Sequence, residues 1–237
     1  MNILLTNDDG IESQAIWSLK QALEKRAHHV YMMAPMENNS ACSMRLSLFL
    51  PFEMEEREDR VYALSGTPVD CVILGTKLME KQYGESIDLV VTGINNGPNL
   101  GTDVYYSGTV GAARQGQIQG INAIAFSYEG YRPTPEENER CAEVAAELVD
   151  RYFNDQERVE ELISVNLPKK VMDEFPEIEE TYIGKRKHQG GTLMKREDGR
   201  YYIDMTDSTF VEDNREGSDS KAVSEGRISV TRIPYGC

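Results

Sequence analysis

The sequence predicts an α/β fold with a Rossmann-like, mostly parallel sheet flanked by helices, followed by a β-rich C-terminal extension. Apolar runs at residues 2–6 and 30–34 enclose a segment with apolar residues at helical spacing, which is the order of a right-handed strand–helix–strand unit. Of the 237 residues, 40% are hydrophobic and 27% charged, enough for one large domain with a packed core. After Pro168, strand-like segments follow one another without helices. We therefore predict an α/β catalytic domain over residues 1–168 and an extension over 169–237 that serves oligomerisation.

The individual elements follow in alternation. Thr67-Pro68-Val69-Asp70 is a typical helix start, because threonine caps the first N–H groups, proline suits the first turn and the aspartate completes a capping box. The charged stretch 53–60 favours a solvated hairpin tip, and 93–109 a long Gly/Asn-rich loop. The expected strands cover residues 2–6, 30–34, 46–50, 61–64, 87–91, 122–126, 162–167, 179–187, 201–205 and 227–233, and the expected helices 11–23, 68–81, 110–118 and 134–152.

The charge balance excludes some classes of partner. Forty acidic residues against 25 basic ones give a net charge of −15. Such a surface repels phosphate backbones, so we expect no nucleic acid polymer as partner. No basic segment followed by a long apolar run is present, so we expect no signal peptide, no membrane span and a cytoplasmic location. The four cysteines are scattered, which is typical of reduced thiols rather than of a zinc site.

The strongest chemical signal is the pair Asp8 and Asp9, which directly follows the first strand. In open parallel sheets, ligands bind beyond the carboxyl ends of the strands, so this pair is placed at the ligand-binding edge. Two adjacent anions repel one another there, and a bound cation resolves the repulsion. Carboxylate oxygens favour Mg²⁺, Mn²⁺ or Ca²⁺ over zinc. The alternative is that the acids only cap the following helix, which one aspartate would achieve.

Three further segments are expected at the same edge. Asn95 and Asn96, which follow strand 87–91, can offer a neutral oxygen to a metal and N–H donors to a phosphate. Ser107-Gly108-Thr109 opens a helix of small residues, where hydroxyl and N–H groups form a phosphate cradle. Ser40, in the loop after the second strand, can complete a metal shell. Alone, each segment is explained at least as well as a turn or a helix cap, so the prediction depends on their combination.

In this order, the motifs resemble those of the SurE survival-protein family. The resemblance covers residues 1–127, with a weaker similarity at 217–219 and 228–231. Ala41, Met44 and Arg45 depart from the family pattern near the mouth of the site, which affects substrate preference more than the chemistry. The segments that carry the resemblance are Asn-Asp-Asp-Gly-Ile at 7–11, Ala34-Pro35, Ser40, Ser65 to Val72, Gly93-Ile94-Asn95-Asn96-Gly97, Asn99-Leu100-Gly101 and Tyr106 to Ala113.

The resemblance implies a metal-dependent 5′/3′-nucleotidase that hydrolyses nucleoside monophosphates and, in some members, short polyphosphate. It implies a Rossmann-like domain whose C-terminal part exchanges elements between subunits of a homodimer or homotetramer. Asp8, Asp9 and Asn96 are the predicted catalytic residues. The implied metal ligands are Asp8, Asp9, Ser40 and Asn95, and the implied phosphate-binding residues are Asn96, Asn99, Ser107, Gly108 and Thr109.

Two other functions stay open on the sequence. Haloacid-dehalogenase-type phosphatases also place aspartates after the first strand, but in the spacing D-x-D, which the adjacent Asp8 and Asp9 do not match. A non-catalytic sensor of a metal and a nucleotide could use the same cradle, although the G-x-G-x-x-G turn of dinucleotide binders is absent after the first strand. For an enzyme, we expect one divalent ion, Mg²⁺ or Mn²⁺ with Ca²⁺ as an alternative in crystals. Asp8 then acts as general base or as nucleophile.

Overall fold

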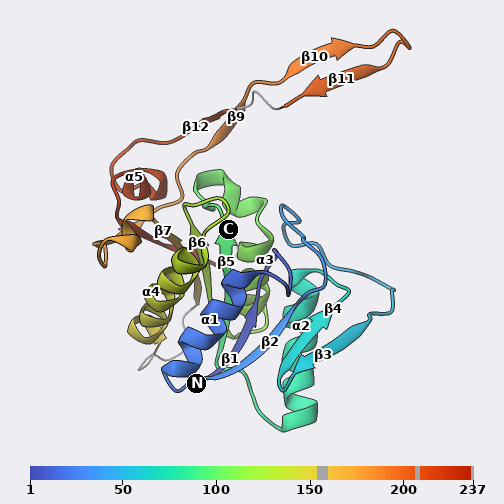
Figure 1. The fold of residues 1–237 in the computed structure, drawn as a ribbon, viewed down its shortest axis with the longest axis vertical. Helices are drawn as coiled ribbons and strands as arrows, with labels where there is room; N and C mark the ends of the chain where they lie inside the picture. Colours follow the sequence, from blue (N-terminus) through green and yellow to red (C-terminus); the bar gives the residue numbers. More distant parts are fainter. Residues whose placement is uncertain (154–159, 206–208, 236–237) are drawn as a thin grey trace.

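A nine-stranded sheet forms the centre of the molecule (Figure 1). The structure is a computed structural model that describes residues 1–153, 160–205 and 209–235. Six neighbouring strands run parallel, which confirms the predicted α/β fold. In their order across the sheet, these are β4 (Val61–Leu64), β2 (His29–Pro35), β1 (Asn2–Thr6), β5 (Leu89–Asn96), β6 (Asn122–Tyr128) and β7 (Glu161–Leu167).

Helices cover both faces of this sheet. On one face, α1 (Gln14–Lys25) packs against α4 (Pro135–Phe153), and on the other α2 (Pro68–Tyr83) packs against α3 (Gly108–Ile118). Strand β1 serves both layers, because successive side chains of a strand point to opposite faces. Ile3 and Leu5 lie in the core under α1 and α4, whereas Leu4 lies in the core under α2 and α3. The expected capping box of α2 is confirmed, with Thr67 and Asp70 bonded to each other's backbone N–H groups.

Three sequence predictions in the N-terminal half were wrong in detail. Residues 46–50 form an exposed loop rather than a strand. The charged stretch expected as a hairpin tip contains β3 (Met54–Glu58), an edge strand antiparallel to β4. All five β3 side chains are exposed, so this strand has no apolar pattern to reveal it, and charged side chains are typical of protected sheet edges. Strand β5 extends to Asn96, and a 3-10 helix follows at Gly101–Tyr105.

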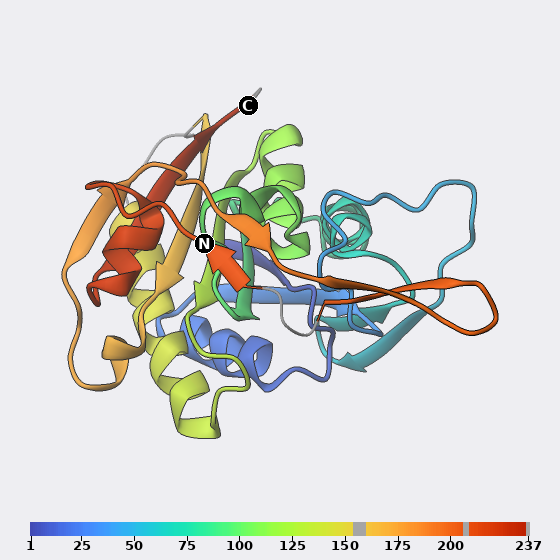
Figure 2. The same ribbon diagram turned by 90° about the horizontal axis from the view of Figure 1, so that it is seen from above.

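One part of the C-terminal extension adds strands to the central sheet, and another part projects from it. Strand β13 (Ile228–Pro234) pairs antiparallel with β7, and β8 (Ile178–Thr181) pairs with β13. Between them, two antiparallel ladders form an arm that projects from the body, on the side of the sheet that carries β3 and β4 (Figures 1 and 2). The ladders are β9 (Lys187–Gln189) with β12 (Thr209–Val211), and β10 (Thr192–Lys195) with β11 (Tyr201–Asp204). The division of the chain into two domains at residue 168 stays a prediction.

Two short helices were not expected in this extension. A 3-10 helix occupies Lys169–Met172, and α5 covers Asp219–Ser224 with Ser218 as its cap. A helix of six residues is too short to show an amphipathic period in the sequence. In the part of the chain that the structure describes, no helix is long and apolar enough to cross a membrane.

Candidate active site at the carboxyl edge of the sheet

The turn after β1 is fixed by Asn7. Its side chain donates to the backbone oxygen of Gly10 at 3.0 Å and accepts from the N–H of Gly10 at 3.1 Å. Gly10 has a left-handed φ of 99°, and a Cβ there would lie 3.3 Å from the Pro35 oxygen. The turn therefore holds the two aspartates between its ends in one orientation at the carboxyl edge of the sheet.

Asp8 is buried and held by one residue from the start of α3. The hydroxyl of Thr109 donates to Asp8 Oδ1 at 2.6 Å, and the N–H of Thr109 donates to Oδ2 at 3.1 Å. Asp8 exposes 2% of its surface and Thr109 none. The carboxylate is thus oriented by two donors, and no cationic side chain in the described part of the chain pairs with it.

Asp9 turns to a different set of neighbours. It accepts the N–H of Asn96 at 3.3 Å and the side-chain amide of Asn38 at 3.4 Å. Both bonds are long, so they compensate a negative charge only weakly. The neighbouring Asn95 side chain donates to the Gly97 oxygen at 2.8 Å, and its Oδ1 lies 3.5 Å from the Thr109 hydroxyl that also binds Asp8.

The electrostatics of the pair call for a positive charge. Burial raises the pKa of Asp8 to about 6, the charge of Asp9 adds to the rise, and the Thr109 hydrogen bonds oppose it. Burial also raises the pKa of Asp9, against the bonds from Asn96. A divalent cation between the carboxylates would reverse both effects. Within the described residues there is no group of three or more His, Cys, Asp or Glu side chains that could hold a metal, so a cation here also needs amide or hydroxyl oxygens.

Three of the four residues expected around that cation share one cavity, whereas Asp9 lines a neighbouring one. Asp8, Ser40 and Asn95 line one cavity of about 510 Å³, and Asn96 lines it as well. Ser40 is exposed, and its N–H donates to the side chain of Asn38 at 2.9 Å. The set offers carboxylate, amide and hydroxyl oxygens only, which is the donor set that Mg²⁺, Mn²⁺ and Ca²⁺ prefer.

The start of α3 reaches the same cavity. Ser107 caps the helix by accepting the N–H of Val110 at 3.1 Å. A Cβ on Gly108 would lie 2.9 Å from the Asp8 carboxylate, so only glycine allows this approach. The Gly108 N–H has no hydrogen-bond partner among residues 1–153, 160–205 and 209–235. Because the Thr109 N–H is used by Asp8, Gly108 supplies the free donor at this helix end.

The main role of Asn99 is to hold the loop after β5 in place. Its side chain donates to the Ser127 hydroxyl at 2.8 Å, and its backbone is bonded in both directions to the Asn166 side chain at 2.8 and 3.1 Å. Asn99 is buried but still lines the 510 Å³ cavity. These bonds join the loop after β5 to β6 and β7.

Some residues in this cavity were not predicted from the sequence. Asp103, Tyr106 and Phe210 line it together with the expected ones. Arg186 stacks on the Phe210 ring, with its guanidinium carbon 3.8 Å from the ring centre, and pairs with Asp103. Phe210 lies 201 positions after Asp9 in the sequence, in the extension, and nothing in its neighbourhood marks it in the sequence.

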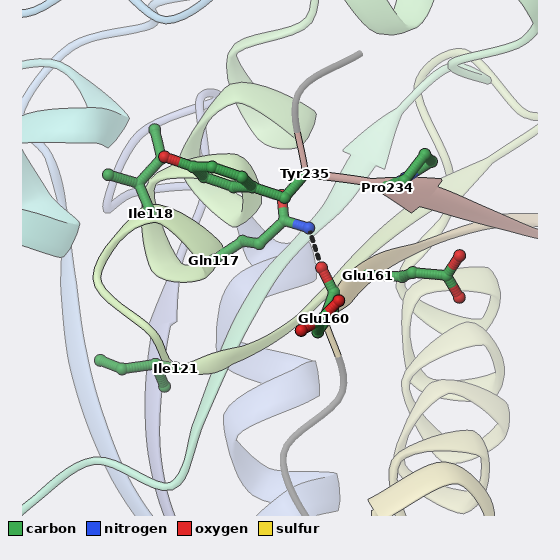
Figure 3. A pocket seen from close by; sticks show the side chains of 7 residues that line it. All are labelled: Gln117, Ile118, Ile121, Glu160, Glu161, Pro234 and Tyr235. Atoms are coloured by element: carbon green, nitrogen blue, oxygen red, sulfur yellow. Dashed lines mark hydrogen bonds between the residues drawn. The ribbon is translucent and has the colours of Figure 1, made fainter.

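A slightly larger cavity, of about 600 Å³, lies at the opposite edge of the sheet (Figure 3). It is lined by Gln117, Glu160 and Tyr235, among others, from the end of α3, the start of β7 and the end of β13. Gln117 donates there to the backbone oxygen of Glu160. None of the predicted site residues lines this cavity.

Comparison with known proteins identifies close relatives along the whole chain. A family model described as Survival protein SurE matches residues 3–190. A protein named 5′-nucleotidase SurE from Vibrio parahaemolyticus serotype O3:K6 is 37% identical over 237 residues, covering 98% of this chain and 88% of its own length. One of the same name from Carboxydothermus hydrogenoformans is 36% identical, covering 99% and 90%. The crystal structure of the SurE protein from Aquifex aeolicus has a TM-score of 0.85 and 33% identity, covering 99% of this chain and 93% of that one.

Proposed function

Because the chain belongs to the survival protein SurE family, we propose that it is a 5′-nucleotidase, a phosphoric monoester hydrolase that converts nucleoside monophosphates to nucleosides and phosphate. The observation that carries this proposal is the adjacent pair of the buried Asp8 and the half-buried Asp9, beside a Gly108 N–H that has no partner among the described residues. In the described residues no cationic side chain pairs with either acid. A cation would offset the charge of the two carboxylates, and a phosphate oxygen would accept the Gly108 N–H.

We propose that Asp8, Asp9, Ser40 and Asn95 hold one divalent metal ion, with Mg²⁺ or Mn²⁺ preferred and Ca²⁺ as the alternative. Their fit rests on the raised pKa of both aspartates and on a donor set made of oxygens alone. When bound, such an ion supplies Lewis-acid chemistry, because it offsets phosphate charge and makes water more acidic.

The chain's own groups then bind and orient the substrate. The Gly108 N–H and Asn96 face the phosphate and stabilise charge on its oxygens, while Ser107 and Asn99 shape the cavity. Thr109 orients Asp8 by two hydrogen bonds, and its direct contact with phosphate stays a prediction. Asp8 acts either as general base for water or as nucleophile.

The same site would accept related substrates. We include nucleoside 3′-monophosphates and short polyphosphates in the proposal, because the polar groups of this cavity recognise a phosphate rather than a base. A non-catalytic sensor of a metal and a nucleotide remains the alternative, and it would bind without release of phosphate.

The test is an assay of phosphate release from a panel of nucleoside 5′- and 3′-monophosphates with Mg²⁺, Mn²⁺ or Ca²⁺, and with EDTA as control. We expect metal-dependent release that EDTA abolishes and added metal restores. Tight nucleotide binding without release under every metal would contradict the enzyme and favour the sensor. Release that is unaffected by EDTA would contradict the metal site.

We further propose that the extension 169–237 joins subunits into a homodimer or homotetramer. The arm exposes large apolar side chains on both of its outer strands, among them Leu193, Tyr201 and Ile203, each more than half exposed. Exposed apolar surface of this kind marks an interaction site. Light scattering after size exclusion should give two or four chains, and deletion of residues 192–204 should lower that number.

A further inference from the structure

The 510 Å³ cavity is larger than a phosphate group and a cation require. Two aromatic side chains, Tyr106 and Phe210, line it beside the polar groups assigned to these ligands. Both are well exposed, with 60% and 40% of their surface accessible. Cavities of about 300–1,000 Å³ are typical of sites that enclose a whole small molecule. The aromatic part of this cavity therefore has room for a further group of the substrate.

Tyr106 lies next to the phosphate-binding start of α3. One residue separates it from Gly108, so the Cα atoms of these two residues lie at most about 7 Å apart. Its backbone is held on both sides, because its N–H donates to the Asp103 oxygen at 2.9 Å and its oxygen accepts the Ser43 N–H at 2.9 Å. A side chain anchored so close to the phosphate site is within reach of a group that a ribose joins to that phosphate.

Phe210 reaches the same cavity from the base of the arm. It is the middle residue of β12, which pairs with β9 where the arm leaves the body (Figure 1). Successive side chains of a strand point to opposite faces, so Val211, which does not line the cavity, lies on the other face of this ladder. The extension thus adds one aromatic ring to a cavity whose other walls come from residues 8–107.

The Phe210 ring is held in place by Arg186. The guanidinium carbon lies 3.8 Å from the ring centre, which is a close cation–π contact. Arg186 is buried and pairs in turn with Asp103 and, at 3.0 Å, with Glu212. Arg186 does not itself line the cavity, so the ring meets the cavity with a part that the guanidinium does not cover. A ring that is fixed before a ligand arrives loses little conformational freedom on binding.

Aromatic side chains of this kind recognise flat aromatic ligands. Every nucleobase has two π faces that stack on phenylalanine or tyrosine rings, and the larger purines offer more area than the pyrimidines. A ribose or an alkyl group gains no stacking. The same cavity therefore combines groups that fit a phosphate with groups that fit a base.

We propose that Tyr106 and Phe210 form a stacking surface for the base of a nucleotide whose phosphate binds beside Asp8. This inference rests on the proposed function and deepens it, because it makes phosphate esters with an aromatic base, purines above pyrimidines, better ligands than esters without one. Arg186 is then a positioning residue, since it acts through the Phe210 ring.

The first test measures binding by titration calorimetry in excess Mg²⁺. The probes are phosphonates in which a CH₂ group replaces the ester oxygen, so the result does not depend on turnover. We expect the analogue of adenosine 5′-monophosphate to bind about tenfold or more tightly than that of ribose 5-phosphate, with the uridine analogue between them. Phe210→Leu keeps an apolar side chain but removes the ring, and it should lower this ratio of dissociation constants at least threefold, as should Tyr106→Leu.

A spectroscopic test separates stacking from folding. Trp17 is the only tryptophan in the sequence, and it does not line the cavity. Phe210→Trp places an indole there, should keep the affinity ratio within about twofold, and should lose fluorescence with the adenosine analogue but not with the ribose analogue. Val211→Trp is the matched control on the opposite face of the same strand, and its fluorescence should not respond to either analogue.

Four outcomes overturn the inference. The first is a wild-type protein that binds the adenosine and ribose analogues equally. The second is a ratio that survives both Phe210→Leu and Tyr106→Leu, and the third is an indole at position 210 that the bound adenosine analogue does not quench. The fourth is a Phe210→Leu variant with fewer chains in light scattering and equally weaker binding of both analogues, which would show that the ring holds the arm instead.

Failure of this inference is distinguishable from failure of the proposed function. Metal-dependent phosphate release from nucleotides without a preference for the adenosine analogue defeats the stacking surface alone. A preference for the adenosine analogue without phosphate release from any nucleotide defeats the proposed function alone.

Discussion

The two edges of the sheet carry cavities of similar size, but their polar groups differ in whether they have partners. At the amino edge, beside the 600 Å³ cavity, Gln117 donates to the backbone oxygen of Glu160 (Figure 3). It also lies 3.4 Å from the backbone oxygen of Ile233, so its buried amide is satisfied. At the carboxyl edge, the buried Asp8 and the half-buried Asp9 both have a raised pKa, and neither has a cationic partner among the described residues. Cavity volume therefore does not distinguish a functional site from a packing cavity, whereas uncompensated charge does.

The largest contrast is expected in catalysis. Asp8→Asn keeps the shape of the side chain but removes the charge that holds a cation, so kcat for a nucleoside monophosphate should fall about 10³-fold. Glu160→Gln makes the same chemical change at the amino edge and should alter kcat less than about twofold. Steady-state assays of both variants check this. An Asp8→Asn enzyme within tenfold of wild type would remove the distinction between the two edges.

The paired acids at the carboxyl edge could be predicted from the sequence because the signals that mark them are local. Asp8 and Asp9 are neighbours in the chain, and Thr67 and Asp70 mark a helix start within four residues. Long-range partners carry no such signal. The Thr109 hydroxyl binds Asp8 across 101 positions, a contact that the sequence pattern does not predict.

Strand β3 and Asn138 were missed for a related reason. An edge strand with five exposed side chains shows no apolar alternation, so pairing with β4 decides its structure. Asn138 belongs to an amphipathic helix whose pattern predicts a helix but not which of its polar residues is buried. Such features depend on packing between elements, which the sequence pattern alone does not specify.

The next contrast is the pH dependence of stability without metal. The pKa of Asp8 rises from an ordinary 3.8 to about 6 in the fold, so between these values the folded chain binds more protons than the unfolded chain. Stability should therefore be highest at the acidic end and be lost as pH rises through about 6, by about 3 kcal/mol from this group. Denaturant unfolding in EDTA from pH 3 to 7.5 should show this loss.

Asp8→Asn provides the matched comparison for that titration. The difference between wild type and variant isolates Asp8 from other titrating groups, and the variant should be the more stable of the two at pH 7.5. A wild-type protein that gains stability relative to the variant between pH 5 and 7 would contradict the assigned environment of Asp8.

A slightly smaller effect is expected from metal binding. At 100 times its dissociation constant, a cation that binds only the folded chain stabilises it by about 2.7 kcal/mol. For a chain of this size, that is a rise in Tm of about 5–10 °C. Thermal unfolding with Mn²⁺ and then with EDTA should show the rise and its reversal in the wild type and in Glu160→Gln. An equal rise in Asp8→Asn would place the cation elsewhere.

The smallest effect belongs to the amino edge. Gln117→Leu removes hydrogen bonds to two backbone oxygens from a side chain that is 6% exposed, and it should cost about 1 kcal/mol of stability. Its kcat and KM should match the wild type. Calorimetric Tm values and nucleotidase assays on the same preparation test both statements, and a loss of activity without a loss of stability would show that this cavity takes part in function.

The most direct test of the central claim is an anomalous-scattering map from a crystal soaked in Mn²⁺. We expect one strong peak between the carboxylates of Asp8 and Asp9, within coordination distance of Ser40 or Asn95, and none in the cavity beside Gln117. A peak elsewhere, with the two carboxylates free of metal in a crystal that still hydrolyses nucleotide, would contradict the account.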